Sequence, residues 1–506
     1  MSVSLLEIAQ LRELEEKYAR ILGPDVLMQR AGKAAAEYIR ELHPETCTVT
    51  VICGPGNNGG DGYVCAKILS ELGYQVSVVN VGGKTPKTEQ AKEALAAWEA
   101  TGATIYTNPY DTPKAQIVVD ALFGIGQTRA LVGEYLDAAM WFNERRALHV
   151  SLDIPTGLDS QTGNWVGGRA GCRADATITF LSGKPGLYTS IGKDACGEVQ
   201  VENLGISIPL TKINLTEVKD FKHVCASRTK NTSKADYGRV GVIGGGKGTV
   251  GAALIAARSA LYMGAGRVYV ELVEEKMDLD PSVPELMFRD KLDLSEMDAV
   301  VIGCGLGFSE KAKARFIECL QSDAALVIDA DALTMVAGDE ELLSLVTHRR
   351  AHTVITPHNA EAARILGCPL EEITADRLNR ALDLSVLTGA VTVLKGAGTI
   401  VCQRSSISWI NPTGTPALAT AGSGDALSGM IAAMFAQRYE LMDCVLSAVY
   451  LHGLASEGCD SGILASDIAP TAAEFLQALR DSYREHFHPL RERTDPVRTD
   501  PVSWED

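Results

Sequence analysis

"TVTVICGPGNNGGDGYVCAKILSELG", Thr48 to Gly73, decides the fold of the first half of the chain. A β-branched run precedes a glycine-rich loop with Asn57, Asn58 and Asp61, and a helical pattern follows from Tyr63. This order predicts a parallel α/β sheet with an anion-binding turn, because amides at a helix start point toward bound phosphates. Glycines let a ligand approach the main chain. A glycine-rich turn alone also serves tight loop geometry, so the specificity comes from the asparagine pair and the acid.

Short apolar runs alternate with longer helical patterns through the first half. The runs are "TVTVIC", "QVSVVNV", "QIVVDALFG", "LHVSLDIP" and "ATITF". Such alternation is typical of a parallel sheet covered by helices on both faces. It predicts a Rossmann-like, three-layer α/β domain.

A second alternation begins at Arg239. Its runs are "RVGVIGGG", "GRVYVELV", "AVVIGCGLG", "ALVIDADAL", "HTVITPH", "VTVLKGAGT" and "TIVC". The runs place Gly, Asp or His at their carboxyl ends, where open α/β sheets bind their ligands. We therefore predict a second α/β domain with its own site. The two halves share no motif, which favours two fused enzymes over an internal repeat.

The length of the chain also predicts two domains. It has 506 residues, whereas single hydrophobic cores stop growing near ~250–300 residues. A polar, weakly periodic stretch after Pro209 separates the halves, and the last stretch is charged and rich in proline. The predicted organisation is a first domain at 1–215, a linker at 216–227, a second domain at 228–485 and a loose tail at 486–506.

Composition narrows the class of function. The formal net charge of -17 and the pI near 5.1 argue against a nucleic-acid binder, which needs a basic face. No apolar run approaches the ~20 residues of a membrane span, and the amino terminus lacks the pattern of a secretion signal. A cytoplasmic protein is therefore expected. The 12 cysteines show no C-x-x-C spacing, which favours buried thiols over disulfides or a metal site.

Two further segments of the first half carry acids near the ends of predicted strands. Asp120 lies in "VVDALFGIG" and Asp153 in "SLDIPTGLDS". With the loop from Gly124 to Ala130, they are expected to gather at one edge of the sheet. Aspartates in such positions also cap loops and helices, so each acid taken alone has a purely structural alternative.

Together, "CGPGNNGGDG", "VVDALFGIG" and "DIPTGLDSQTG" resemble the NAD(P)H-hydrate epimerase family, the N-terminal half of bifunctional NAD(P)H-hydrate repair enzymes, from about Leu5 to Ile208. The resemblance implies a site for the hydrated nucleotide and a potassium ion. The implied substrate-facing residues are Asn57, Asn58, Gly59, Gly60, Asp61, Gly124, Ile125, Gly126, Gln127, Thr128, Arg129, Ala130 and Asp153. The implied potassium ligands are Asn58, Asp120 and Thr156, whose oxygens suit a hard cation.

The implied reaction needs a group that moves protons. Hydrated NAD(P)H carries a hydroxyl on the ring carbon beside the ring nitrogen, whose lone pair can help to expel it. Inverting this centre requires loss and return of the hydroxyl, or an equivalent ring opening, with a proton shuttle. Asp153 is the predicted catalytic shuttle.

"LATAGSGDALSGMIAAMFAQR", Leu418 to Arg438, carries the strongest signal of the second half. Its apolar residues fall on one face of a helix that follows "GSGD". Amides at the helix start would stabilise charge on a phosphoryl group, and Asp425 would take a proton from a hydroxyl. The segment resembles the anion hole and base of the ribokinase-like superfamily. The structural alternative is that Asp425 only caps the helix.

"LKGAGT", "VIDADAL" and "TPHNAEAARILG" resemble ADP/ATP-dependent NAD(P)H-hydrate dehydratases, over roughly Ser227 to Leu479. The resemblance implies that phosphoryl transfer turns the ring hydroxyl into a leaving group, with Asp425 as base and Mg²⁺ bridging phosphate oxygens. The implied nucleotide-binding residues are Lys395, Gly396, Ala397, Gly398, Thr399 and Gly424. The implied hydrate-binding residues are Ala253, Gly305, His358 and Asp425, and Glu361 would orient the magnesium ion through water.

Three positions depart from the dehydratase pattern. Lys247 stands where the family commonly has Ser, Cys304 where it has Pro, and Asn359-Ala360 where it has Pro-Gly. The first two are expected to tune loop geometry. The third leaves His358 and Glu361 in place but bears on how they are positioned.

The resulting hypothesis is a nicotinamide nucleotide repair enzyme of two α/β domains, Rossmann-like and then ribokinase-like. It would epimerise NAD(P)H hydrate and dehydrate the S form with ADP, giving AMP and phosphate, in a homo-oligomer that uses K⁺ and Mg²⁺. One alternative is a ribokinase-like small-molecule kinase with a non-catalytic N-terminal binding domain. Another is a first half that serves only in binding or oligomerisation, against which Asn58, Asp120 and Asp153 speak.

Overall fold

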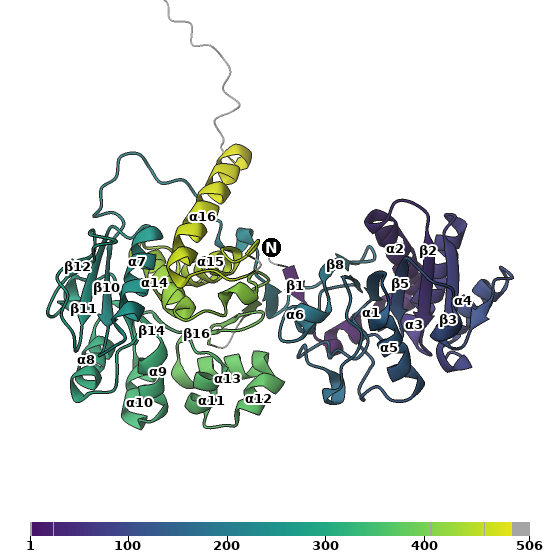
Figure 1. Ribbon diagram of the computed structural model, residues 1–506, viewed down its shortest axis with the longest axis horizontal. Coiled ribbons are helices and arrows are strands. Elements are labelled where there is room, and N and C mark those ends of the chain that lie inside the picture. Colours follow the sequence, from purple (N-terminus) through teal and green to yellow (C-terminus); the bar gives the residue numbers. More distant parts are fainter. Residues whose placement is uncertain (1–2, 24, 405–406, 460, 488–506) are drawn as a thin grey trace, which may run out of the picture.

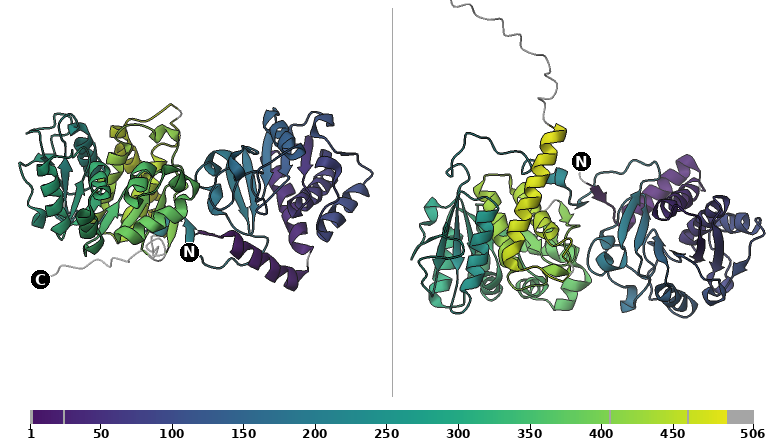
Figure 2. Two further views of the ribbon diagram at one scale, coloured as in Figure 1. Left: turned by 90° about the horizontal axis from the view of Figure 1, so that it is seen from below. Right: turned by 45° about the horizontal axis from the view of Figure 1, so that its top comes forward.

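The chain forms two α/β domains that lie side by side (Figures 1 and 2). The structure is a computed structural model and describes residues 3–23, 25–404, 407–459 and 461–487. One sheet has seven strands and the other has 11. The fold class predicted from the two alternating patterns is confirmed.

The first sheet is parallel throughout, in the order β4-β3-β2-β5-β6-β7-β8. Its strands are β2 (Thr48–Cys53), β3 (Gln75–Asn80), β4 (Ile105–Tyr106), β5 (Ile117–Ala121), β6 (Leu148–Leu152), β7 (Ala176–Phe180) and β8 (Glu198–Glu202). The central strands are buried on both faces, which explains their continuous apolar runs. The strand order reverses between β2 and β5, the place where open sheets bind ligands.

Helices cover both faces of this sheet. They are α1 (Ile8–Leu22), α2 (Val26–Leu42), α3 (Asn57–Glu71), α4 (Glu89–Glu99), α5 (Glu134–Glu144) and α6 (Gly192–Ala195). One apolar cluster joins α2, α3 and α4 to one face, and a second, built on Trp141 and Phe142 of α5, covers the other. This arrangement holds the sheet in the middle of three layers.

The second sheet runs β1-β9-β18-β17-β16-β15-β14-β13-β10-β11-β12. Its parallel part comprises β10 (Arg239–Gly244), β11 (Arg267–Leu272), β12 (Met287–Phe288), β13 (Ala299–Ile302), β14 (Ala325–Ile328), β15 (Thr353–Ile355) and β16 (Val391–Leu394). Antiparallel β17 (Ile400–Cys402) and β18 (Ser408–Ile410) follow. The order reverses between β10 and β13, which marks the second expected site.

Helices also cover both faces of the second sheet. One apolar cluster includes α7 (Val250–Tyr262), α14 (Ser423–Ala436), α15 (Leu441–Leu454) and α16 (Ala465–Phe487). The other includes α8 (Glu310–Gln321), α9 (Ala330–Ala337), α10 (Glu340–His348), α11 (Asn359–Leu366), α12 (Leu370–Ala375) and α13 (Arg377–Thr388). The sites of the two domains therefore lie on separate sheets.

Two strands from the first predicted segment belong to the second sheet. β1 (Val3–Leu5) pairs with β9 (Ile213–Leu215), and β9 pairs with β18. The predicted domain boundaries stay a prediction. The predicted tail at 486–506 reaches the end of α16, and from 488 onward it lies outside the described residues.

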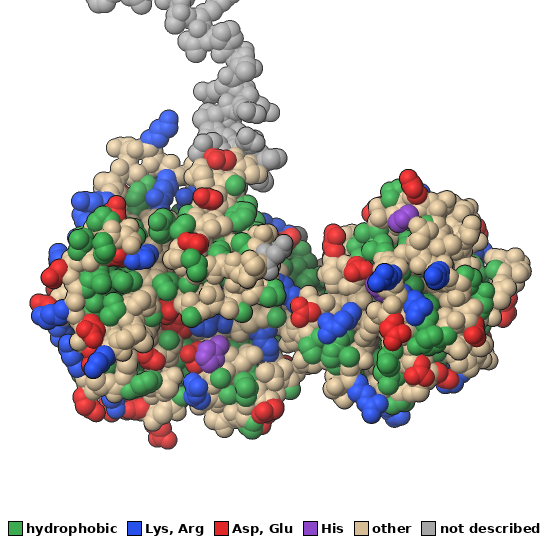
Figure 3. Space-filling view, in the orientation of Figure 1, with side chains coloured by type: hydrophobic (Ala, Val, Ile, Leu, Met, Phe, Trp, Pro, Cys, Tyr) green, Lys and Arg blue, Asp and Glu red, His purple; other side chains and the backbone are tan. Residues whose placement is uncertain are grey.

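The surface carries mixed charge. On the face in Figure 3, acidic and basic side chains are interspersed over both domains. Within the described part of the chain, no helix is both long and apolar enough to span a membrane. The 12 cysteines, all of them described, are free of disulfides.

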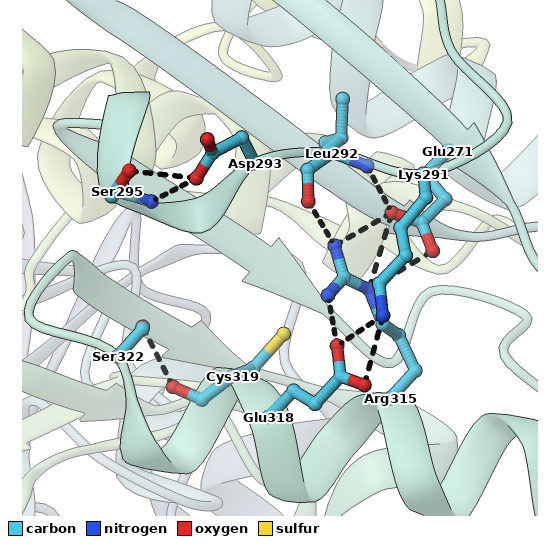
Figure 4. Close-up of polar contacts among 9 residues, drawn as sticks. All are labelled: Glu271, Lys291, Leu292, Asp293, Ser295, Arg315, Glu318, Cys319 and Ser322. Carbon is cyan, nitrogen blue, oxygen red and sulfur yellow. Dashed lines mark hydrogen bonds and ion pairs between the residues drawn. The ribbon is translucent and has the colours of Figure 1, made fainter.

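A buried ion pair ties α8 to β11 (Figure 4). Arg315 donates to Glu271 at 2.8 to 3.2 Å and to the carbonyl oxygen of Leu292 at 2.7 Å, and Leu292 N donates to Glu271 at 2.8 Å. Glu318 and Lys291 extend the network toward solvent. The pair thus fixes the loop after β12 against α8.

Replacing Glu271 with glutamine should destabilise the protein by about 3–5 kcal/mol, because the Arg315 charge would lose its buried counter-ion and keep only the partly exposed Glu318. Urea unfolding followed by circular dichroism measures the loss. Glu318→Gln is the matched control: this acid is 43% exposed and should contribute at most about 1 kcal/mol. Equal losses in the two variants would contradict the assignment.

Two candidate active sites

The first site is a cavity of about 1000 Å³ at the point where the order of the first sheet reverses. Residues from α1, the start of α3, the loop after β5 and the end of β6 line it. Of the predicted substrate-facing residues, the lining includes Asn57, Asn58, Asp61, Gly124, Ile125, Gly126, Gln127, Thr128, Arg129, Ala130 and Asp153. Gly59 and Gly60 are buried behind this wall.

The glycine-rich segment differs from the predicted loop. We predicted a helix only after Gly62, which is wrong because α3 begins at Asn57. Its glycines allow close packing: a Cβ on Gly59 would lie 1.9 Å from the Gly54 carbonyl oxygen, and one on Gly62 2.6 Å from Ala121 Cβ. The segment therefore presents the first turn of a helix to the cavity, with its unpaired amides.

Asp153 is held at the end of β6 in a left-handed conformation, with φ of 66°. One carboxylate oxygen accepts a hydrogen bond from Ile125 N at 3.2 Å, and the other contacts Lys184 Nζ at 2.6 Å. A Cβ on Gly124 would lie 2.5 Å from an Asp153 carboxylate oxygen, so a larger residue there would displace this carboxylate. Asp153 remains partly open to the cavity, with its side chain 15% exposed.

Lys184 was not predicted. It is 1% exposed, and its ammonium group also donates to Thr179 Oγ1 at 2.6 Å and to the Phe180 carbonyl oxygen at 2.9 Å. These partners fill its three donor positions. Lys184 therefore neutralises and orients Asp153. The only sequence signal is a lysine in the segment that follows β7, at the same edge of the sheet.

Two further carboxyl groups lie in the wall of the cavity. Burial raises the pKa of Asp61 well above its usual range, and the charges of Asp153 and Glu15 raise it further. Burial and then the charge of Asp153 raise the pKa of Glu15 to about 7. Glu15 was missed because α1 has the charge pattern of a solvated helix. The site thus combines the Asp153–Lys184 pair with groups that can hold protons at neutral pH.

Of the residues implied as potassium ligands, Asn58 lines the cavity, whereas Asp120 and Thr156 are fully buried and hydrogen-bonded to each other. Buried Asp120 accepts hydrogen bonds from Thr156 Oγ1 at 2.7 Å and Thr156 N at 2.8 Å. Asn58 is buried, and both polar atoms of its amide lack a hydrogen-bond partner. An unpartnered buried amide oxygen, together with the buried carboxylate of Asp120 and hydroxyl of Thr156, offers the kind of oxygen donors that suit a weakly held cation.

The second site lies at the carboxyl ends of β10 and β13. Gly305, with φ of 61°, accepts hydrogen bonds at its carbonyl oxygen from Gly246 N at 2.5 Å and Thr249 Oγ1 at 2.9 Å. Lys247 is exposed on the same turn, and Ala253 is fully buried beside Gly244. The two glycine-rich turns are thus locked together at the edge of the sheet.

The start of α14 meets a buried ion pair. Gly422, with φ of 90°, is the N-cap residue before the helix, and a Cβ on Gly424 would lie 2.9 Å from Lys395 Nζ. Lys395 contacts Asp329 at 2.9 Å, and Ser428 donates to Asp329 at 2.8 Å. Burial alone would raise the pKa of Asp329. The charge of Lys395 and the hydrogen bonds from Lys395 and Ser428 outweigh this effect, so the pKa of Asp329 is lowered. A fixed cation therefore stands beside the free amides of α14.

Asp425 lies in the first turn of α14. Burial and then the charge of Asp329 raise the pKa of Asp425 to about 6, while a hydrogen bond with Cys304 opposes the rise. One donor atom each of Cys304, Asp329 and Asp425 lies within 4.8 Å of the others. Cys304, one of the three departures from the dehydratase pattern, thus contacts the predicted base. Asp329 lies in "VIDADAL", and the sequence predicted no role for it.

His358 and Glu361 cap α11. His358 Nδ1 accepts hydrogen bonds from Ala360 N and Glu361 N, and Glu361 accepts one from His358 N at 2.8 Å. Burial and the charge of Lys395 lower the pKa of His358. The Asn359-Ala360 departure therefore preserves the cap. Roles for His358 in the hydrate site and for Glu361 at magnesium stay predictions.

The predicted nucleotide loop, Lys395 to Thr399, follows β16. Gly396 and Gly398 have φ of 145° and 63°, which favour glycine, and Thr399 Oγ1 donates to the Gly396 carbonyl oxygen at 3.1 Å. Gly396 and Ala397 are exposed. Lys395 therefore joins this loop to the start of α14. Arg377 donates hydrogen bonds to the carbonyl oxygens of Leu394, Lys395 and Ala397 and so holds the backbone of the loop.

Comparison with known proteins matches both domains. Residues 240–476 match a family model described as NAD(P)H-hydrate dehydratase, and residues 24–186 match one described as YjeF-related protein N-terminus. The bifunctional NAD(P)H-hydrate repair enzyme of Coxiella burnetii is 35% identical, covering 92% of this chain and 98% of that protein. Its Escherichia coli counterpart is 36% identical, covering 91% and 92%.

A solved ADP/ATP-dependent NAD(P)H-hydrate dehydratase from Bacillus subtilis, co-crystallised with ATP/Mg²⁺, is 26% identical, with a TM-score of 0.45. The match covers 53% of this chain and 99% of that one.

Proposed function

Because this chain belongs to the family of bifunctional NAD(P)H-hydrate repair enzymes, we propose that it epimerises the R and S forms of NAD(P)H hydrate and dehydrates the S form at the expense of ADP. The observation that carries the proposal is the same at both sheets: one partly buried acid stands beside helix-start amides where the strand order reverses. These features suit a phosphorylated substrate whose ring hydroxyl exchanges a proton.

In the first site, Asp153 would shuttle a proton. The protonated hydroxyl leaves as water with the bonding electrons while the ring nitrogen lone pair compensates, and water then adds to the other face and returns the proton, which inverts the centre. Lys184 and Ile125 N hold the Asp153 carboxylate in place for this step. The first turn of α3 and the Gly124–Ala130 loop would bind the phosphates and orient the ring.

Potassium is proposed beneath this site, held by Asn58, Asp120 and Thr156. The unpartnered Asn58 amide supports the assignment. The ion would supply positive charge beside the substrate phosphates. This chain's own residues would orient the ring and transfer the proton.

In the second site, Asp425 would accept the proton of the ring hydroxyl as its oxygen attacks the terminal phosphoryl group of ADP. The bond from oxygen to phosphorus forms, the bond to the AMP oxygen breaks, and AMP leaves. Phosphate then departs from the ring with its bonding electrons, and loss of a proton from the adjacent ring carbon restores NAD(P)H. Amides of α14 and Lys395 would stabilise the phosphoryl charge.

Magnesium is proposed to bind to the nucleotide phosphates and offset their negative charge. Carboxylate oxygens of Asp329 and Asp425 lie within 4.8 Å of each other at the start of α14 and would be available to the ion. Glu361 is buried and bonded to His358, which suits a role through water rather than direct ligation. ADP as donor and assembly into a homo-oligomer stay predictions.

One assay tests the proposed function. Mixed epimers of hydrated NADH are incubated with ADP or with ATP, and recovery of NADH is followed by absorbance while the nucleotide products are separated. Complete recovery with ADP, and formation of AMP, supports both activities. A stable phosphorylated product without NADH would instead indicate the kinase alternative, and recovery that stops with one epimer left would indicate an inactive first domain.

The dehydratase rate should fall as the pH drops through about 6, because Asp425 must be ionised to accept a proton and its pKa is raised to about 6. Below this value the rate should decrease about tenfold per pH unit. Initial rates at saturating ADP between pH 5 and 8 measure the profile. Full recovery on return to pH 7.5 is the control for unfolding, and a flat profile would contradict the role of Asp425.

A further inference from the structure

Arg377 connects the nucleotide loop to the first domain. It lies at the start of α13 and is 4% exposed. Its Nη1 donates to Thr189 Oγ1 at 2.7 Å and to the carbonyl oxygens of Ala397 at 2.5 Å and Gly398 at 3.1 Å. Its Nη2 reaches the carbonyl oxygens of Leu394 and Lys395, each at 3.2 Å. One buried guanidinium therefore fixes most of the loop and a hydroxyl from the other domain.

The first domain contacts the loop directly as well. Thr189 Oγ1 donates to the Ala397 carbonyl oxygen at 3.2 Å, and Ser190 N donates to the same oxygen at 3.1 Å. Ser190 holds φ of 54°, which costs conformational energy for a residue other than glycine. A Cβ on Gly398 would lie 2.0 Å from the Tyr188 carbonyl oxygen. The loop is thus seated against the segment from Tyr188 to Ser190.

The same segment reaches the approach to α14. Lys193 Nζ donates to the Gly414 carbonyl oxygen at 2.7 Å, and the chain then runs from Gly414 to the start of α14. In Figure 1, α6 lies on the side of the first domain that is next to the second domain. Residues 188–193 therefore support both backbone segments that flank the proposed phosphoryl-transfer site.

We propose that Thr189 is a positioning residue that the first domain supplies to the second site, where it holds the loop from Lys395 to Thr399 ready for the nucleotide. The inference rests on the proposed nucleotide-binding role of this loop. Without the Thr189 hydroxyl, Arg377 loses a buried acceptor and the Ala397 oxygen loses a donor. The loop then becomes ordered only when ADP binds, which weakens affinity without removing a reacting group.

The test compares Thr189→Ala and Thr189→Val with Thr189→Ser, which keeps the hydroxyl. The KM for ADP should rise about tenfold in the first two variants, since an unsatisfied buried partner costs this order of affinity. Their kcat and their epimerase rate should stay within about twofold of the parent. Thr189→Ser should restore the KM. An unchanged KM in folded Ala and Val variants would overturn the proposal.

Two controls separate possible failures. Thr177 is buried in the first domain and donates to the Cys196 carbonyl oxygen at 2.7 Å, away from the loop. Thr177→Ala should therefore lower thermal stability but leave the KM for ADP unchanged, and a similar rise in KM would overturn the specific role of Thr189. Lys395→Ala tests the loop itself. A normal KM for ADP in Lys395→Ala would reject the nucleotide-binding role of the loop. A raised KM in Lys395→Ala together with a normal KM in Thr189→Ala would reject the positioning of the loop by Thr189.

Discussion

Replacing Asp425 with asparagine is expected to reduce the dehydratase kcat by about 10³-fold, within the range that general acid–base groups contribute. The amide cannot accept the ring-hydroxyl proton, while the helix-start amides and Lys395 remain to bind the phosphates. The KM for ADP should change little. Recovery of NADH from the pure S epimer with saturating ADP measures the loss.

The same variant contains its own control. Its epimerase rate should equal that of the parent, because Asp153 lies on the other sheet. Its melting temperature should not fall through loss of charge: the raised pKa of Asp425 means that burial disfavours the carboxylate in the folded protein at neutral pH. Near-normal turnover in the folded variant would contradict the role of Asp425 as the base and leave it only the structural role of a helix cap.

The central strands of both sheets could be predicted from the sequence because each is buried on both faces and therefore reads as a continuous apolar run. The location of the acids near strand ends could also be predicted, since the carboxyl ends of parallel strands meet at one edge of the sheet. β1 and β9 could not be predicted. They have three residues each and lie at one edge of the second sheet, too short to show a period.

The site residues that the sequence did not predict were missed for a different reason. Lys184 pairs with an acid 31 positions away, and Arg377 pairs with Thr189 188 positions away. Neither residue belongs to a motif for which the sequence predicts a site, and only the folded chain shows that each is buried and hydrogen-bonded to backbone carbonyl oxygens. The start of α3 was misjudged because glycine and asparagine are typical of loops, whereas here glycine permits contact with the neighbouring strands.

Asp153→Asn is expected to lower the epimerase rate by about 10²–10⁴-fold, because the proton shuttle is lost. The asparagine oxygen can still accept from Lys184, so the variant keeps an acceptor for that buried ammonium group. With mixed epimers and ADP, NADH should appear rapidly up to the share of the S epimer and then rise only at the rate of uncatalysed epimerisation. Chiral separation of the residual hydrate should show the R form.

The matched control is Asp159→Asn. Asp159 caps the turn after Asp153, accepting hydrogen bonds from Gln161 N and Thr162 N, and it lies outside the lining of the cavity. That variant should recover NADH completely at the parental rate. Dehydration of the pure S epimer should be normal in both variants, which excludes general misfolding. If Asp153→Asn recovers NADH completely and rapidly, the proton shuttle must be another group in the wall of the cavity. Glu15, with its pKa of about 7, is then the next residue to replace.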